Sequence, residues 1–146
     1  MNNEKDIFDS PVVSIVVDSE GEPHCEVAPA VVSPHGEAWY SHGELHRLGG
    51  PAVTHKNGLT QWWVRGYLHR HGGPAITYSD GGTEWWWEGI PHRLDGPAFV
   101  GANGDVEWWL QGYRYPSEEE WRAALEVLSS EDPNERLLPP EAYQNS

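Results

Sequence analysis

The sequence is poor in cysteine and in long apolar runs, and each shortage excludes a class of protein. Cys25 is the only cysteine of the 146 residues, so neither an internal disulfide nor a zinc site built from thiolates can form. The apolar run near the start, residues 12–17, is too short for the core of a signal sequence or for a membrane span. These shortages predict a soluble protein of the cytoplasm.

Basic residues are also scarce. Acidic residues outnumber them by 23 to 9, which gives a net charge of −14. The excess belongs to the ends: residues 1–36 hold seven acids and one Lys, and residues 117–146 hold eight acids and two Arg. The stretch between them is nearly balanced, with eight acids and six basic residues. Because an acidic chain repels phosphate, we expect no binding to a nucleic-acid backbone.

What the sequence does contain is a unit that returns every 23 residues, from Trp39 to about Tyr115. Each copy reads aromatic-aromatic, two residues, Gly, two residues, His-Arg, two residues, Gly-Pro-Ala, four residues, Asn/Asp-Gly. The first glycine stands at positions 43, 66, 89 and 112, so the period does not drift. A fixed period in this range indicates a repeat architecture, here a mainly β, elongated array of antiparallel hairpins in a twisted sheet.

The flanks of the array predict its boundaries. A degenerate copy of the unit, which we call the worn copy, runs from Gly21 to Ala30, as expected of a terminal repeat. Ser117 and Glu120 form a capping box before an apolar helical stripe that begins at Trp121. We therefore expect a flexible acidic arm at 1–11, a degenerate cap repeat at 12–38 and hairpin repeats at 39–116. A capping α-helix at 117–130 and an irregular acidic tail at 131–146 follow.

The Asn-Gly or Asp-Gly dipeptides at 57–58, 80–81 and 103–104 predict the strand register. They favour two-residue hairpin turns of type I′. Counted outward from the turn, Val53 then faces Trp62 and Ala52 faces Trp63, and the other copies give the same pairing. The first tryptophan of each doublet is predicted to face the core and the second to face the opposite, polar side.

The second aromatics would form a file on that polar side. Exposed aromatic surface with a polar rim marks an interface, so the file is one candidate binding stripe. Alternatively, the acidic N-terminal segment or the C-terminal helix covers it. The file consists of Tyr40, Trp63, Trp86 and Trp109.

Each copy also repeats a His-Arg pair. Arginine could hold a phosphate through two hydrogen bonds while a tryptophan stacks on a base. Alternatively, each His or Arg bonds a neighbouring backbone carbonyl and spaces one hairpin from the next. Recurrence in every copy favours this second interpretation, since a ligand site needs its groups once. The residues concerned are His46, Arg47, His69, Arg70, His92 and Arg93.

Metal-binding and catalytic patterns are weak. Neither the histidines at 69 and 71 nor those at 42 and 46 have a carboxylate or cysteine at matching spacing, so we predict no metal site and no cofactor. His92 with Asp95 is the only short acid–base pair inside a copy, and no nucleophile motif or phosphate loop is present. The chain is predicted not to be an enzyme.

The repeated unit resembles the MORN repeat, and more closely its bacterial and viral variant. That variant reads W-Y/W-x-x-G-x-x-H-R-x-x-G-P-A with Asn/Asp-Gly turns, and it matches positions 39–112. His-Arg and Gly-Pro-Ala replace the Gly-x-Gly spacing of the standard unit, which weakens any transfer of its lipid-contact roles. The resemblance implies an elongated twisted sheet used for protein contact, of a kind often labelled antitoxin-like and also found in phages. It supplies no catalytic residue.

These features together lead to three hypotheses. The first is a non-catalytic module that blocks or sequesters a protein partner, as an antitoxin or a phage inhibitor of a host factor would. The second is a sponge that holds a nucleotide or another phosphate-bearing ligand between Trp and His-Arg. The third is an acidic mimic of nucleic acid. Membrane binding is not expected, and the edge strands of the array could pair two chains into a homo-oligomer.

Overall fold

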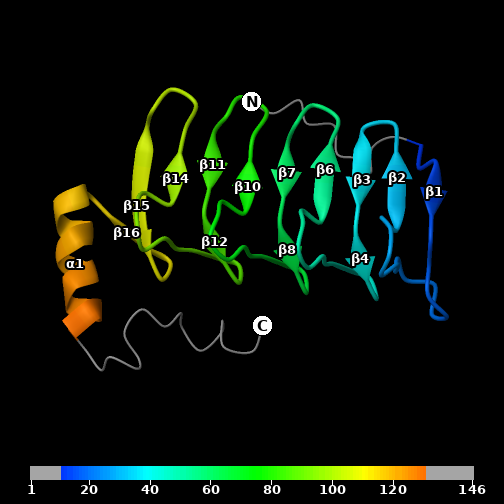
Figure 1. Cartoon of the computed structure of the whole chain (residues 1–146), viewed down its shortest axis with the longest axis horizontal. Coiled ribbons are helices and arrows are strands. Elements are labelled where there is room, and N and C mark those ends of the chain that lie inside the picture. The colour runs from blue at the N-terminus through cyan, green and yellow to red at the C-terminus, as the bar shows by residue number, and fades with distance from the viewer. Residues whose placement is uncertain (1–10, 131–146) are drawn as a thin grey trace.

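The computed structural model describes residues 11–130, and the acidic tail and nearly all of the acidic arm predicted above lie outside this range. The architecture is mainly β, as predicted: a ten-stranded antiparallel sheet, a row of two-stranded hairpins and one helix (Figure 1). The strand order is β1-β2-β3-β6-β7-β10-β11-β14-β15-β16. The elements are β1 Ser14–Ile15, β2 Val31–Ser33, β3 Gly36–Ala38, β4 Tyr40–Ser41, β5 Glu44–Leu45, β6 Val53–His55, β7 Thr60–Gln61, β8 Trp63–Val64, β9 Tyr67–Leu68, β10 Ile76–Thr77, β11 Thr83–Glu84, β12 Trp86–Trp87, β13 Ile90–Pro91, β14 Phe99–Val100, β15 Val106–Leu110, β16 Tyr113–Tyr115 and α1 Glu118–Ser130.

Each copy of the unit follows the same path. We number the copies unit 1 (residues 39–61), unit 2 (62–84), unit 3 (85–107) and the half copy unit 4 (from 108). A full unit turns a corner at its first aromatic residue, makes a small hairpin, and then adds two strands to the large sheet. At the corner of unit 2, the Trp62 N–H donates to the Ala75 carbonyl of the large sheet (2.7 Å), while its carbonyl accepts from the His69 N–H (3.0 Å). The first tryptophan thus joins the two layers.

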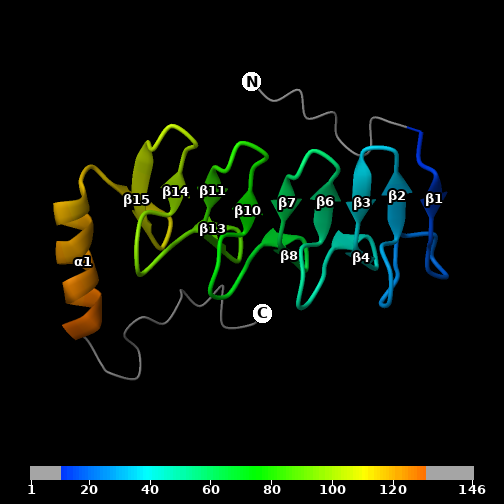
Figure 2. The same cartoon turned by 45° about the horizontal axis from the view of Figure 1, so that its top comes forward.

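The small hairpins form a continuous row along one border of the large sheet, visible in both Figure 1 and Figure 2. Backbone hydrogen bonds connect neighbouring hairpins: Gly66 N–H donates to the Leu45 carbonyl (2.9 Å), and Arg47 N–H donates to the Trp63 carbonyl (3.0 Å). Equivalent bonds recur from unit to unit. The array is therefore held together in two layers at once.

The small hairpins contain a two-residue turn in which both residues have positive φ. In unit 2 these are Arg65 (φ 50°) and Gly66 (φ 77°), between the paired residues Val64 and Tyr67. This is the geometry of a type I′ turn. A residue other than glycine holds the left-handed conformation in every copy, at His42, Arg65, Glu88 and Gln111.

The predicted type I′ turn at the Asn/Asp-Gly dipeptides was wrong. Gly58 has positive φ (102°) but Asn57 does not, and the turn bonds join His55 N–H to the Leu59 carbonyl (2.9 Å) and Gly58 N–H to the His55 carbonyl (3.0 Å). The loop therefore has three residues, and Val53 pairs with Gln61 rather than Trp62. The Asn57 side chain accepts the Leu59 N–H (2.9 Å), which favours this alternative. The other units show the same shift, with Ile76 opposite Glu84 and Phe99 opposite Glu107.

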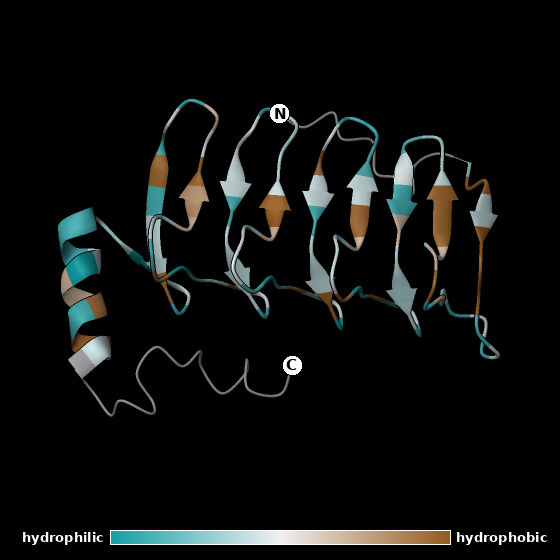
Figure 3. Cartoon of the chain, viewed as in Figure 1, coloured by the Kyte–Doolittle hydropathy of each residue, from teal (hydrophilic) through white to brown (hydrophobic). Residues whose placement is uncertain are grey.

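The shift of one residue also overturns the predicted faces of the tryptophans. The second aromatics, not the first, pack beside the apolar strand residues: Trp63 contacts the buried cluster that contains Val53, and Trp86 meets Phe99 at 5.7 Å between ring centres. The alanines of Gly-Pro-Ala are fully buried. Figure 3 shows the apolar residues concentrated along β2, β6 and β10.

The C-terminal helix forms as predicted. Its N-terminus is capped by Ser117, whose Oγ accepts the Glu120 N–H (3.2 Å). Trp121 is 2% exposed and packs on Trp108 at 4.9 Å between ring centres. The helix contacts β16 and also β15, the strand that carries Trp109 of the aromatic file, and it closes the end of the array.

Candidate functional site

The guanidinium of each His-Arg pair lies over the ring of the first tryptophan of its own unit. In unit 2 the Arg70 Cζ atom lies 3.9 Å from the centre of the Trp62 ring, and Nη1 donates to the Pro74 carbonyl (3.1 Å). This geometry combines a cation–π contact with a charge-assisted hydrogen bond. The same arrangement joins Arg47 to Trp39 and Pro51, and Arg93 to Trp85 and Pro97.

The glycine of each Gly-Pro-Ala motif leaves space for this arginine, because any larger residue would place a Cβ atom against the guanidinium. A Cβ atom built on Gly73 would lie 2.7 Å from the Arg70 Cζ atom, and the equivalent distances at Gly50 and Gly96 are both 2.9 Å. The proline supplies the carbonyl that the arginine bonds, and the alanine is buried. The three-residue motif is therefore part of the arginine's binding cage.

The histidine of each pair accepts a hydrogen bond from the backbone of the next unit. His69 Nδ1 accepts a hydrogen bond from the backbone N–H of Glu88 (3.2 Å), one of the residues with positive φ. Since Nδ1 is the acceptor, the proton of the neutral ring lies on Nε2. His46 accepts from Arg65 (3.1 Å), His92 from Gln111 (2.9 Å), and His24 of the worn copy from His42 (3.1 Å).

One interpretation of the sequence was that each His or Arg bonds a neighbouring backbone carbonyl. The structure shows this for the arginines but not for the histidines. The arginines bond a backbone carbonyl as expected, whereas the histidines accept from a backbone N–H. Burial lowers the pKa of His92 to about 4, and it also lowers the pKa of His69, with a further contribution from the charge of His71. The lowered pKa values favour the neutral imidazole at His69 and His92, the form whose Nδ1 accepts the backbone N–H.

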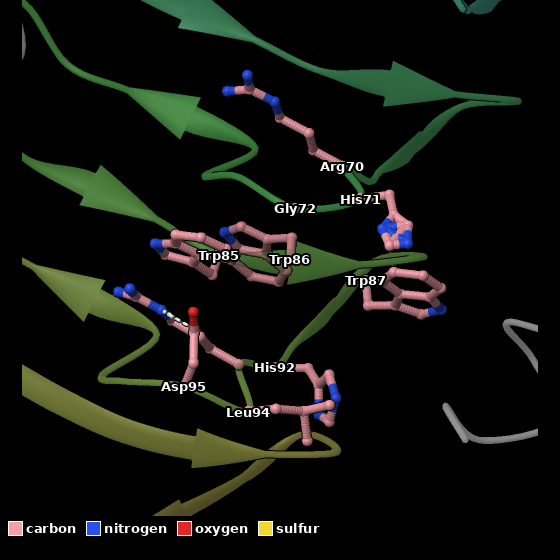
Figure 4. A pocket seen from close by; sticks show the side chains of 10 residues that line it. Arg70, His71, Gly72, Trp85, Trp86, Trp87, His92, Leu94 and Asp95 are labelled. Atoms are coloured by element: carbon pink, nitrogen blue, oxygen red, sulfur yellow. Dashed lines mark hydrogen bonds and ion pairs between the residues drawn. The ribbon is translucent and has the colours of Figure 1, made fainter. Parts of the chain in front are cut away.

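A groove opens beside the tryptophans of unit 3, which we call the unit-3 groove (Figure 4). It encloses about 300 Å³ and lies between the loop at residues 70–72 and the segments 85–87 and 92–95. A related cavity of about 470 Å³ lies at unit 1, beside Trp39, Tyr40 and Leu48. The grooves are therefore a product of the repeat. The unit-3 groove is lined mainly by the carbon atoms of Trp85, Trp86, Trp87 and Leu94, with His71 and His92 at its border.

Two ring-bearing side chains of the unit-3 groove have no counterpart at the equivalent positions of the other copies. Trp87 stands where the other units have Ser41, Val64 and Leu110, and His71, in the preceding loop, replaces Leu48 and Leu94. The ring of His71 lies 5.6 Å from that of Trp87, which also meets His69 at 4.5 Å, both edge to face. Figure 4 shows His71 and Trp87 side by side. The repeated motif does not indicate this pair, because both residues stand at positions that vary among the copies. A position-by-position comparison of the copies would have found them.

The aromatic file is half-buried. Each of its tryptophans bonds the residue two positions before it, as Trp86 Nε1 does with Glu84 Oε2 (2.8 Å). Trp63 bonds Gln61 (3.2 Å) and Trp109 bonds Glu107 (2.9 Å) in the same way. The file Tyr40, Trp63, Trp86 and Trp109 thus contributes partly to the core and partly to the surface, with Trp86 and Tyr40 lining the two grooves.

The acid–base and histidine pairs considered above make contacts within the chain. The Asp95 carboxylate accepts from Arg93 Nε (2.8 Å). His42 Nδ1 lies 2.7 Å from an Asp18 oxygen and its ring stacks on His24. Within residues 11–130, no three His, Cys, Asp or Glu side chains gather as a metal ion would require.

No protein-family model matches the chain, and no curated protein or solved structure matches it. Over the described part of the chain, no helix has the length and apolar character needed to cross a membrane.

Proposed function

We propose that this chain is a non-catalytic protein-binding repeat module that blocks or sequesters a protein partner, in the manner of an antitoxin or a phage-encoded inhibitor. The observation that carries the proposal is the unit-3 groove. It is apolar, open to solvent and lined by the only tryptophan triplet of the sequence. Concave apolar surface with tryptophan and a few polar groups is the usual setting of a binding hot spot.

The repetition of the scaffold strengthens this choice of site. We call the repeated contacts of the His-Arg pairs the His-Arg ladder. It recurs in every full unit and consists of contacts within the chain, as at Arg70 and His69. His71 and Trp87 are absent from that ladder's pattern, so the fold of the other units does not require them. Residues that a repeat does not need for its own structure are the natural carriers of specificity. We therefore place the centre of the partner contact at this pair.

The test replaces the two distinctive residues with those of the neighbouring units. The tagged double variant His71→Leu, Trp87→Val and the wild type are each used to capture partners from host lysate, with mass spectrometry as the readout. A partner held by the wild type should be lost by the variant. Titration of that purified partner should show a loss of affinity of at least about 30-fold, as expected for a hot-spot tryptophan.

The control is the reverse change in unit 1, Leu48→His, at an exposed position of an equivalent loop. It should leave capture unchanged. Thermal unfolding of all variants separates lost binding from lost folding. If the folded double variant holds the same partner as tightly as the wild type, the proposal is wrong.

The two alternative functions gain no comparable support. A nucleotide sponge needs free arginine edges, yet each ladder arginine already has one face on a tryptophan and Nη1 on a carbonyl, as Arg93 does on Trp85 and Pro97. Absorbance near 260 nm of the purified protein would reveal a bound nucleotide. Nucleic-acid mimicry would make partner binding collapse with salt while leaving it insensitive to Trp87→Val.

A further inference from the structure

A second cavity, which we call the loop hollow, lies between the loop at residues 78–82 of unit 2 and the loop at residues 101–105 of unit 3. It encloses about 390 Å³, at the border of the large sheet where these two loops stand side by side (Figure 1). Most of its lining comes from one face of the adjoining strands, because alternate residues of a strand point to the same side. The residues of that face include Tyr78, Gly82, Glu84, Phe99, Gly101 and Glu107.

The loop hollow results from two glycines that lie opposite each other. The register of β11 and β14 continues beyond the strands to place Gly82 opposite Gly101. At the junction of units 1 and 2, which has the same register, the equivalent positions hold Leu59 and Tyr78. Leu59 is 1% exposed. Two large side chains thus fill the first junction, whereas the second stays open, and the repeat itself does not require this difference.

The charge that lines the loop hollow has one sign. Of the described residues in its lining, none is lysine, arginine or histidine, and four carry a carboxylate. Arg114 of β16 approaches one of these acids, with its Nη2 atom 3.6 Å from Glu107 Oε1, and both side chains are exposed. The hollow therefore favours a positively charged occupant. The four acids are Asp80, Glu84, Asp105 and Glu107.

An aromatic ring lies among the carboxylates. Phe99 stands between Glu84 and Glu107 across the sheet. Its ring meets those of Trp86 and Trp109, at 5.7 and 5.6 Å between centres. The same tryptophans hold the two carboxylates in place: Trp86 Nε1 donates to Glu84 Oε2 (2.8 Å), and Trp109 Nε1 donates to Glu107 Oε2 (2.9 Å). The hollow thus combines fixed negative charge with an apolar surface.

We propose that the loop hollow receives an arginine side chain of the protein partner. This inference rests on the proposed function and names the chemistry of that partner. An arginine has an apolar stem and a planar guanidinium, which stacks on aromatic rings and forms paired hydrogen bonds with carboxylates. Phe99 offers the ring, with Glu84 and Glu107 on either side of it. Trp86 lines the unit-3 groove and contacts both Glu84 and Phe99, so one partner can cover the two sites.

An NMR titration of the full chain with a short glycine peptide that carries one central arginine tests the site directly. The amide signals of Gly82 and Gly101 should shift and saturate, with a dissociation constant on the order of 1 mM. The same peptide with citrulline, the neutral isostere of arginine, should bind at least about tenfold more weakly. The absence of a saturable shift, or equal binding of the two peptides, overturns the proposal.

Matched variants locate the binding. The double variant Glu84→Gln, Glu107→Gln should weaken binding of the arginine peptide at least about tenfold. The fold accepts glutamine here, since Gln61 holds the equivalent position of unit 1 and bonds the neighbouring tryptophan. The control Glu119→Gln, Glu126→Gln changes the net charge equally at exposed positions of α1 and should alter affinity by less than about twofold. Equal losses in both double variants would indicate attraction to net charge alone and overturn the proposal.

Filling the loop hollow provides a second test of the same site. The double variant Gly82→Leu, Gly101→Tyr gives this junction the residues of the junction between units 1 and 2. It should abolish binding of the arginine peptide without removing any carboxylate. A folded variant of this kind that binds the peptide as the wild type does would contradict the proposal, and the charge variants decide the question if the filled variant does not fold.

The partner captured through the unit-3 groove separates this inference from the proposed function. Its affinity should fall at least about tenfold for Glu84→Gln, Glu107→Gln. An unchanged affinity overturns the arginine site and leaves the groove proposal standing. Conversely, His71 and Trp87 do not line the hollow, so the variant His71→Leu, Trp87→Val should bind the arginine peptide normally. If that variant also keeps the partner, the groove proposal fails while the arginine site stands.

Discussion

The guanidinium of Arg70 lies on the ring of Trp62, with 3.9 Å between Cζ and the ring centre. The backbone of Gly73 also packs closely against this guanidinium, so the arginine contacts both an aromatic ring and a backbone. This arrangement explains why tryptophan, arginine and Gly-Pro-Ala recur together: each is needed for the same contact. It is the structural definition of the unit.

Gly73→Ala should therefore destabilise the protein by about 1–3 kcal/mol, the usual cost of overpacking. The added Cβ would lie 2.7 Å from the Arg70 Cζ atom, and the guanidinium would have to leave the Trp62 ring. Urea unfolding followed by tryptophan fluorescence measures the change. A double-mutant cycle provides the control: in an Arg70→Ala background, Gly73→Ala should cost much less. Equal costs in both backgrounds would contradict the steric explanation.

His92 should make stability fall between about pH 6.5 and pH 4. Its pKa in the folded protein is about 4, below the ordinary value of 6.5, so the unfolded chain takes up a proton first as the pH is lowered. The contribution is fully present above pH 6.5 and its loss reaches roughly 3 kcal/mol below pH 4. Unfolding free energies at several pH values measure it.

The matched comparison for this titration is His71→Leu, which removes an exposed histidine outside the ladder. His92→Gln should flatten the pH dependence in this window, while His71→Leu should keep most of it. If the wild type and His92→Gln show the same slope, burial of this imidazole does not control acid stability.

Gln111→Asn should stabilise the protein by about 0.5–1 kcal/mol. Gln111 holds φ 51° beside Gly112 in a type I′ turn, and Asn-Gly is the preferred dipeptide for that geometry. The side chain is exposed, and the backbone N–H that His92 accepts is unchanged. Thermal unfolding measures the gain, and Gln111→Ala serves as the comparison because alanine offers no local compensation. A gain equal to that of Asn from the alanine variant would argue against backbone strain as the cause.

Trp121→Ala should cost about 3–5 kcal/mol, as expected for a large aromatic residue buried in a packed contact. Its ring lies against Trp108, so its loss removes the closing contact at the C-terminal end of the array. Circular dichroism and urea unfolding should show reduced helix content and a lower midpoint. Val127→Ala, at an exposed position of the same helix, should change stability by less than about 1 kcal/mol.

The period and the capping helix could be predicted because they rest on spacing and on local hydrogen bonds. The register could not. An Asn-Gly dipeptide suits both a two-residue turn and a three-residue loop with a bulge. The choice depends on whether Asn57 takes positive φ or accepts the Leu59 N–H with its side chain. That one decision reverses which tryptophan of a doublet packs beside the apolar strand residues, as Trp63 and Trp86 show.

The candidate site was predictable in part. The repetition of His-Arg favoured contacts with neighbouring backbone, and the arginines do bond carbonyls, as Arg70 does with Pro74. The histidines instead accept a backbone N–H that lies 19 residues further along the chain, as His69 does from Glu88, and no local pattern indicates this partner. The unit-3 groove depends on the corner at Trp85, which alternation along a strand does not reveal. Trp87 and His71 were visible in the sequence as departures from the unit, and a comparison of copies would have singled them out.

The histidine ladder has an evolutionary consequence. Each unit reaches only its immediate successor, as when His46 of unit 1 accepts from Arg65 of unit 2. Gene duplication or deletion of one whole 23-residue segment therefore recreates every junction with the same partners, whereas gain or loss of a single residue breaks the match. A change of one whole segment outside residues 70–95 would thus alter the length of the array and leave the two dissimilar ends and the unit-3 groove unchanged.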